Sequence, residues 1–301
     1  MKSGDEIVVS KAEHHSVLLP FQELAARTGA TLKWFDLDDE GRILANTADE
    51  VITERTKIVA VTHVGNTTGA ITDIAPIVKR AHEVGAVVVL DACQSVPHLK
   101  IDLHALDVDF AAWSAHKMYG PTGVGFLYGK REMLEALPPA NFGGSMVELA
   151  WMDQEAQYMA PPARFEAGTQ PVAQVVAAGV AAEWLMNIGM ENLEAHERVI
   201  AGELLKMGQI EGVRILGPHA NERRIGTVAF EIEGVHPHDV GQFIDAQGIA
   251  IRVGHHCAQP VHRHFGVYAS NRASSGIYNC VEDAQALVEA LKKVRPFFGV
   301  K

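Results

Sequence analysis

Short apolar runs alternate with amphipathic, helix-like segments through the first half of the chain. The pattern predicts strands at Glu6–Ser10, Thr31–Phe35, Lys57–Val61, Ala86–Leu90, around Phe110 and at Phe126–Tyr128, and helices at His15–Thr28, Asp73–Val84 and Val172–Ile188. Near-continuous apolar strands separated by helices are typical of a parallel sheet that is covered on both faces. Residues Asn141–Gly168 show no clean period, and we expect a hairpin and a loop there.

After about Gly189 the pattern changes. It predicts strands at Val213–Leu216, Ile225–Ile232 and Ala250–Val253, and helices at Glu191–Met207, Asp239–Ala246 and Val281–Arg295. Strands and helices that mix in this way indicate an α+β unit. The chain is therefore predicted to be an α/β protein, with a large, mainly parallel domain at residues 1–188 and a smaller C-terminal domain at 189–301.

Composition narrows the class of protein. The formal net charge of −11 argues against nucleic-acid binding, which needs basic patches. We expect no membrane span, because no apolar run is long enough, and the first residues lack the apolar core of a signal peptide. The 3 cysteines are too few and too scattered for a disulfide framework, so we expect a reducing, cytoplasmic setting.

The segment Trp113–Lys117 carries the most specific chemistry. A lysine that follows a buried strand can be desolvated, which favours the neutral amine that a Schiff base requires. Ser114 and His116 stand within three residues of Lys117, and both side chains suit a phosphate. Together they predict a pyridoxal 5′-phosphate (PLP) site.

Other polar residues follow neighbouring strands. Asp91 closes an apolar strand, and Asn66 and Lys117 also follow strand ends, where ligands of such sheets bind. A carboxylate at Asp91 can pair with a protonated pyridine nitrogen, and Gln94 can donate to the phenolic oxygen. A turn aspartate and a surface glutamine are the simpler interpretations.

A pair of histidines directly follows the first strand. The imidazole of His14 can stack on a pyridine ring and move protons near neutral pH. We interpret its neighbour His15 as a polar surface residue.

Cys257 lies in a loop, Gly254–Pro260, beside His255 and His256. Two imidazoles there can help to form a thiolate, which is a nucleophile's environment. A metal site is the rival, but adjacent residues rarely all face one metal, so we predict none. The guanidinium of Arg272 can clamp a substrate carboxylate. Cys93 and Cys280 are interpreted as packing residues.

These residues occur in an ordered set of motifs over essentially the whole chain: Glu13–His15, His63–Asn66, Asp91–Gln94, Ser114–Lys117, Arg164–Thr169, His255–Ala258 and Arg272–Ser274. The set resembles the class V aminotransferase superfamily of fold-type I PLP enzymes. Within it, the chain is most similar to the SUF-type (group II) cysteine desulfurases.

The resemblance implies a role for each residue. PLP would be held by His14, Asn66, Asp91, Gln94, Ser114, His116 and Lys117, with Lys117 as the Schiff-base lysine. Thr169 would contact the phosphate bound in the partner subunit, which implies a homodimer. Arg272 and Asn66 would bind L-cysteine, and Cys257 would carry the persulfide while alanine is released. Iron–sulfur cluster assembly is the implied destination of the sulfur.

The loop around Cys257 is short, so a dedicated acceptor protein of the SufU or SufE kind is expected to come to the site. His238 is similar in place to a histidine that captures the zinc of a SufU-type acceptor. The alternative is a polar residue at a helix N-terminus.

The sequence departs from the family at Gly65 and Gln170, where serine and proline are frequent. In the family a substantial segment, with a threonine-containing phosphate turn, precedes the strand that leads to His14. The expectation is a fragment, an alternatively started product, or a protein in which those contacts are replaced. Two rivals stay open, a selenocysteine lyase and a non-catalytic PLP-fold scaffold.

Overall fold

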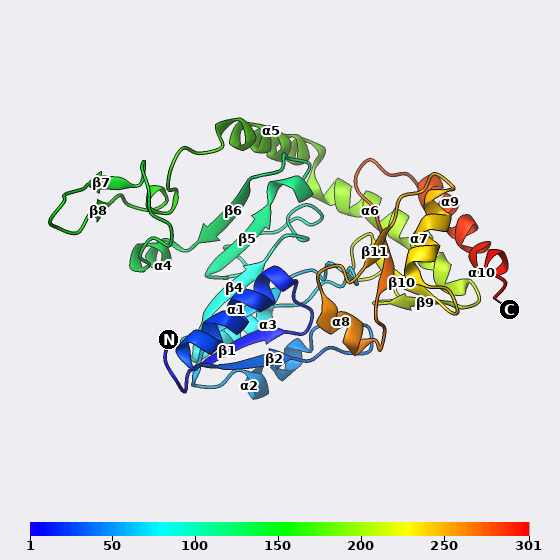
Figure 1. Cartoon of the computed structure of the whole chain (residues 1–301), viewed down its shortest axis with the longest axis horizontal. Coiled ribbons are helices and arrows are strands. Elements are labelled where there is room, and N and C mark those ends of the chain that lie inside the picture. The colour runs from blue at the N-terminus through cyan, green and yellow to red at the C-terminus, as the bar shows by residue number, and fades with distance from the viewer. Residues whose placement is uncertain (301) are drawn as a thin grey trace.

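The computed structural model describes residues 1–300. Its larger sheet has six strands in the order β2-β1-β3-β4-β5-β6 (Figure 1). The strands are β1 Glu6–Ser10, β2 Thr31–Phe35, β3 Thr56–Thr62, β4 Val87–Asp91, β5 Phe110–Ser114 and β6 Gly125–Gly129. The first five run parallel and β6 runs antiparallel to β5, which confirms the predicted mainly parallel sheet.

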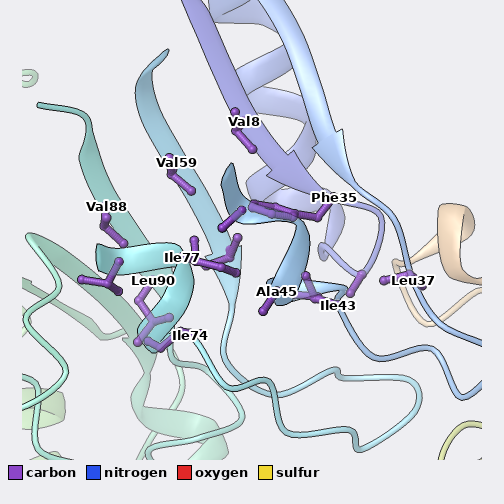
Figure 2. Packing of buried hydrophobic residues seen from close by; sticks show 14 of the residues in the cluster. Val8, Phe35, Leu37, Ile43, Ala45, Val59, Ile74, Ile77, Val88 and Leu90 are labelled. Atoms are coloured by element: carbon purple, nitrogen blue, oxygen red, sulfur yellow. The ribbon is translucent and has the colours of Figure 1, made fainter. Parts of the chain in front are cut away.

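Helices cover both faces of this sheet, because alternate strand residues point to opposite sides. The helices of the first half are α1 His15–Thr28, α2 Ala48–Val51 and α3 Ala75–Glu83. Val8 belongs to a core with Ile74 and Ile77, next to and within α3 (Figure 2). Its neighbours Ile7 and Val9 lie in a separate cluster against α1.

The second sheet is antiparallel, with the order β11-β12-β10-β9. Its strands are β9 Val213–Leu216, β10 Thr227–Ile232, β11 Arg252–Gly254 and β12 Ser270–Ser274. The helices of this half are α6 Met190–Leu204, α7 Pro237–Asp245, α8 Gln259–His264, α9 Val281–Leu291 and α10 Val294–Phe297. Apolar residues from α6, α7 and α9 form one core with this sheet. Figure 1 shows α8 between the two sheets.

Several predicted elements are confirmed to the residue, among them β1, α1, β2 and β9. The helix α1 ends where Gly29 adopts a left-handed φ of 72° and donates to the Ala25 carbonyl. The predicted helix at Glu191–Met207 changes to a 3-10 helix at Leu205–Gln209. The polar strand β12 and the short helices α4 (Arg131–Ala136) and α8 were not predicted.

The expected hairpin lies between α4 and α5 (Val172–Ile188), and consists of β7 Val147–Leu149 and β8 Gln157–Tyr158. Figure 1 shows it projecting away from both sheets. The helix α5 carries large apolar side chains that are exposed in this chain: Val172, Val175, Val176, Val180, Trp184 and Met186. In residues 1–300 no single helix has the length and apolar character to cross a bilayer, and α5 passes that test only jointly with the following helix, across a bend of 78°.

Candidate active site

The carboxyl ends of β4 and β5 bring the predicted cofactor residues to one edge of the large sheet. Asp91 is the last residue of β4 and lies opposite Thr62 of β3. Ser114 ends β5, and a 3-10 helix, Ala115–Lys117, follows at once. Lys117 and Asp91 therefore lie at the carboxyl ends of the strands, as predicted from the sequence, and ligands of such sheets bind at this edge.

His14 joins this group from the end of β1. Burial lowers its pKa, the Lys117 ammonium lowers it further, and the Asp91 carboxylate opposes both. The three side chains are thus close enough to interact. The amide of Ser16 donates to Nδ1 of His14 across 3.1 Å, so in the neutral imidazole the proton is on Nε2.

Asp91 does bond to the backbone of the turn after β4, which was the simpler interpretation of this residue. It also lies at the strand end, in a position suited to a cofactor. Its Oδ1 accepts from the Cys93 amide at 2.9 Å. Burial, with the Asp91 charge, raises the pKa of the Cys93 thiol to about 11, so this cysteine is not a nucleophile near neutral pH.

Glu13 is a fully buried carboxyl that the sequence analysis did not single out. Its Oε1 accepts from the Thr62 amide at 2.9 Å and from the Ser10 hydroxyl. Burial raises its pKa to about 8, and the nearby Asp91 charge adds to the increase. Glu13 is therefore neutral at pH 7 and ties the end of β1 to the end of β3, directly beside Asp91.

The cysteine loop is a tight turn with unusual backbone angles. His256 and Cys257 are consecutive non-glycine residues with left-handed φ values of 50° and 56°. Each such residue costs roughly 1–2 kcal/mol, so the surrounding contacts must hold the turn.

Two residues that follow strands of the large sheet, Asn66 after β3 and His15 at the start of α1, hold this turn by its carbonyls. Nδ2 of Asn66 donates to the His256 carbonyl at 2.6 Å. The amide of His15 donates to the Cys257 carbonyl at 2.8 Å. The half-buried Cys257 is thereby docked at the start of α1, next to His14.

The interpretation of His15 as a plain surface residue is wrong. Besides its amide contact, its Nε2 accepts from the Gln259 amide at 3.2 Å, so the side chain and the backbone both hold the cysteine loop. The signal was weak because the two partners are 244 residues apart in the chain.

The prediction that both imidazoles beside Cys257 promote a thiolate is wrong for His256. This ring is 4% exposed, and burial lowers its pKa to about 3, so it carries no charge near neutral pH. Its Nε2 lies 3.0 Å from Oγ of Ser270 instead. Within residues 1–300, no three His, Cys, Asp or Glu side chains are arranged to hold a metal ion.

Arg272 faces the same site from the middle of β12. One Nη donates to the Asn66 carbonyl at 2.9 Å. Burial and the neighbouring Arg252 lower the pKa of Arg272 to about 10, and Cys257 opposes them. Its Nε–H is buried and has no acceptor in the described part of the chain, which is a rare and costly arrangement.

The remaining predicted residues are less closely joined. Gln94 is half-buried beyond Asp91, and His116 is exposed one residue before Lys117. Thr169 is exposed in the segment before α5, and in residues 1–300 no hydrogen bond or ion pair links it to the other site residues. The interpretation of Cys280 as a packing residue is wrong, because it is exposed at the N-cap of α9.

Comparison with known proteins agrees with this geometry. The family model "Aminotransferase class-V" matches residues 1–287. The "Probable cysteine desulfurase 2" of Mycobacterium leprae is 49% identical over 297 residues, covering 98% of this chain and 70% of the relative. The "Probable cysteine desulfurase" of Streptomyces coelicolor is 48% identical, with 98% and 70% covered.

Solved structures give the same result. The cysteine desulfurase CsdA of Escherichia coli, in an S-sulfonic acid form, superposes with a TM-score of 0.94 at 36% identity, covering 99% of this chain and 73% of that one. The chain therefore belongs to the class V aminotransferase family, and within it to the cysteine desulfurases. Pyridoxal 5′-phosphate is the cofactor of this family.

The residues present fit that cofactor. Lys117 and Asp91 lie together at the sheet edge, and burial lowers the pKa of His14, which favours the neutral ring that can stack on an aromatic cofactor. The amine of Lys117 matches the aldehyde of the cofactor, and the carboxylate of Asp91 matches its pyridinium nitrogen. The flat imidazole of His14 matches its aromatic ring.

Proposed function

We propose that this chain is a PLP-dependent L-cysteine desulfurase that forms alanine and a persulfide on Cys257. The observation that carries the proposal is the docking of the Cys257 turn against Asn66 and His15. These contacts bring a thiol to the edge of the sheet that carries Lys117. A lysine and a thiol at one site suit sulfur abstraction rather than transamination.

Cofactor binding would rest on the strand-end residues. Lys117 would hold PLP covalently, Asp91 would pair with its ring nitrogen, and His14 would stack on the ring. Gln94, Asn66, Ser114 and His116 are proposed to complete the contacts. When bound, PLP supplies an electron sink for the pair left at the substrate's α-carbon.

The chain's own residues would then perform the sulfur transfer. Arg272 binds the cysteine carboxylate, with Asn66 beside it, and Lys117 carries the α-proton away. The Cys257 thiolate attacks the substrate sulfur, forming an S–S bond while the substrate's Cβ–S bond breaks. The electron pair stays on the carbon fragment, which takes up protons and leaves as alanine. His14 would take the substrate's thiol proton.

A homodimer follows from this proposal. The exposed apolar side chains of α5 suit burial against a second copy. Thr169 lies just before α5, so the same contact would bring it toward the partner's phosphate site. We also propose that the large domain ends at residue 188, where α5 ends, and that the smaller domain is 189–301.

The persulfide would be passed to an acceptor protein of the SufU or SufE kind, for iron–sulfur cluster assembly in the cytoplasm. His238 is exposed in the first turn of α7, and its ring stacks on His236 with centroids 5.7 Å apart. An exposed imidazole there can reach a metal on an acceptor. His238→Ala should abolish stimulation by a zinc-containing acceptor and leave basal alanine production intact, and unchanged stimulation would refute this role.

One experiment tests the proposed activity. Purified chain with added PLP should become yellow, retain the cofactor on Lys117 after borohydride reduction, and release alanine from L-cysteine. A colourless chain that gains no colour with PLP would instead support a scaffold. A much higher rate with L-selenocysteine, retained when Cys257 is replaced, would indicate a selenocysteine lyase.

A further inference from the structure

We propose that Ser270 and His262 are positioning residues for Cys257, acting through the ring of His256. The inference deepens the proposed function, and rests on it in taking Cys257 as the sulfur acceptor. It concerns three buried side chains next to Cys257: His256 in the turn, His262 of α8 and Ser270 of β12.

The hydroxyl of Ser270 bridges the imidazoles of His256 and His262 next to the cysteine turn. Oγ of Ser270 lies 3.0 Å from Nε2 of His256 and 2.9 Å from Nε2 of His262. The three residues are between 0% and 4% exposed. Nδ1 of His262 lies 3.0 Å from the Ala258 carbonyl, the residue that follows Cys257.

The direction of each hydrogen bond follows from the Ala258 carbonyl, which can only accept. Nδ1 of His262 therefore carries the proton, and Nε2 of that neutral ring is an acceptor. The Ser270 hydroxyl must donate to it, so the Ser270 oxygen accepts from Nε2–H of His256. Burial lowers the pKa of both imidazoles, which agrees with two neutral rings.

This chain of bonds holds the strained part of the loop. His256 and Cys257 both have left-handed φ values, and the ring of His256 is fixed to β12 and α8 through the network. His262 also fixes the Ala258 carbonyl, on the other side of Cys257. The turn is thus held by the network, through the His256 ring and the Ala258 carbonyl, and by Asn66 and His15, through the His256 and Cys257 carbonyls.

The network leaves one lone pair unused. Nδ1 of His256 is buried and has no partner in the described part of the chain. The His256 ring therefore stabilises the turn through Nε2 alone, while Nδ1 stays buried and unpaired. Because such unpaired atoms are rare, this arrangement agrees with a ring whose role is to position the turn.

Ser270→Ala is the direct test, because it removes the bridge and adds no bulk. The first readout is the rate at which iodoacetamide alkylates Cys257 in the resting protein, followed on the Cys257 peptide by mass spectrometry. Because the His256 ring loses the one buried hydrogen bond that anchors it, Cys257 should react about fivefold to tenfold faster. This readout requires no desulfuration, so it decides the inference even if the proposed activity fails.

The second readout separates positioning from general damage. Ser270 and Arg272 lie two residues apart on the same face of β12, so a distorted strand would also raise the KM for L-cysteine. Positioning predicts a kcat for alanine about fivefold to tenfold lower with KM unchanged. Ser270→Thr retains the hydroxyl and should restore both readouts.

Two further variants complete the design. Ser275→Ala removes another buried hydroxyl, bonded to the Gly226 carbonyl at 3.2 Å, and should leave Cys257 alkylation unchanged. His262→Phe should reproduce Ser270→Ala, and the double variant should be no worse than either. Wild-type alkylation and kcat in Ser270→Ala, or equal effects in Ser275→Ala, would overturn the inference.

Discussion

The lysine edge and the cysteine turn are two halves of one site that are built differently. Lys117, Asp91 and Ser114 are presented by the ends of adjacent parallel strands, so regular secondary structure alone brings them together. Cys257 lies in a turn with left-handed backbone angles, and its placement depends on hydrogen bonds to residues far away in the chain.

The difference has a consequence for robustness. The lysine edge rests on a buried sheet core, so loss of one polar contact leaves its geometry intact. The cysteine turn reaches that core only through Ala258, which follows Cys257, so each hydrogen bond to the turn carries a larger share of its position. Variants at the edge should therefore abolish single chemical functions, and variants around the turn should misplace an intact thiol.

Lys117→Ala should have the largest effect, because it removes a chemical group and not merely a contact. Loss of a positioned proton carrier alone costs about 10²–10⁴-fold in rate. Alanine production should fall by at least that factor, and borohydride should no longer attach the cofactor to the chain. Lys57→Ala, an exposed lysine in β3, is the matched control and should behave as wild type.

Arg272→Lys tests the contact that lies between the two halves. A lysine keeps the charge but cannot bind a carboxylate with two parallel donors. Loss of a charged hydrogen bond costs about 1.5–3 kcal/mol, so the KM for L-cysteine should rise roughly 10-fold to 100-fold. A KM within twofold of wild type would show that the carboxylate binds elsewhere.

His15→Phe should have a smaller effect, since it keeps the ring and removes only the acceptor for the Gln259 amide. One neutral hydrogen bond is worth about 0.5–1.5 kcal/mol, so kcat should fall roughly threefold to tenfold. His264→Phe removes a bond to the Asp38 carbonyl from the end of α8 and serves as the control. Equal losses in both variants would contradict a specific role for His15.

A separate expected effect is on stability as a function of pH. Burial lowers the pKa of His63 to about 4 and of His256 to about 3, below the unfolded value of 6.5. Below pH 6.5 the unfolded chain then binds more protons, so the free energy of unfolding should decrease as the pH falls toward 4. Urea denaturation at pH 5.0 and 6.5 measures this change, and equal midpoints would contradict it.

Glu13 acts in the opposite direction. Its pKa is raised from 4.5 to about 8, so its contribution is complete below pH 4.5 and is lost as the pH rises through 8. Glu13→Gln keeps a neutral side chain at every pH. The urea midpoint of the parent chain should decrease between pH 6.5 and 8.5. In the Glu13→Gln variant this decrease should be absent.

The lysine edge was predictable from sequence because its signals are local. Apolar runs fixed the strands, and the rule for strand ends brought Asp91 and Lys117 together. Glu13 was missed, although it follows β1 as His14 does, because a buried neutral carboxyl has no sequence signal of its own. The exposed side chains of α5 gave no periodic pattern either, since that helix is apolar on all sides.

The cysteine turn was largely beyond sequence reasoning. The strand β12 is polar, Ser-Asn-Arg-Ala-Ser, yet Ser270 and Asn271 are fully buried in it. Tertiary pairing with β10 and β11 overrides its weak strand propensity. The partners of His15 and of His256 come from distant segments. Neither the hydrogen bonds of His15 nor the uncharged state of His256 could therefore be predicted from the motif itself.

The most direct test of the two-part site is Cys257→Ser, assayed for alanine, for protein-bound persulfide and for the absorbance of the Lys117-bound cofactor. If the site has these two parts, alanine and persulfide formation from L-cysteine should fall to background in this variant while the cofactor absorbance is unchanged. Undiminished alanine formation by this variant would contradict it.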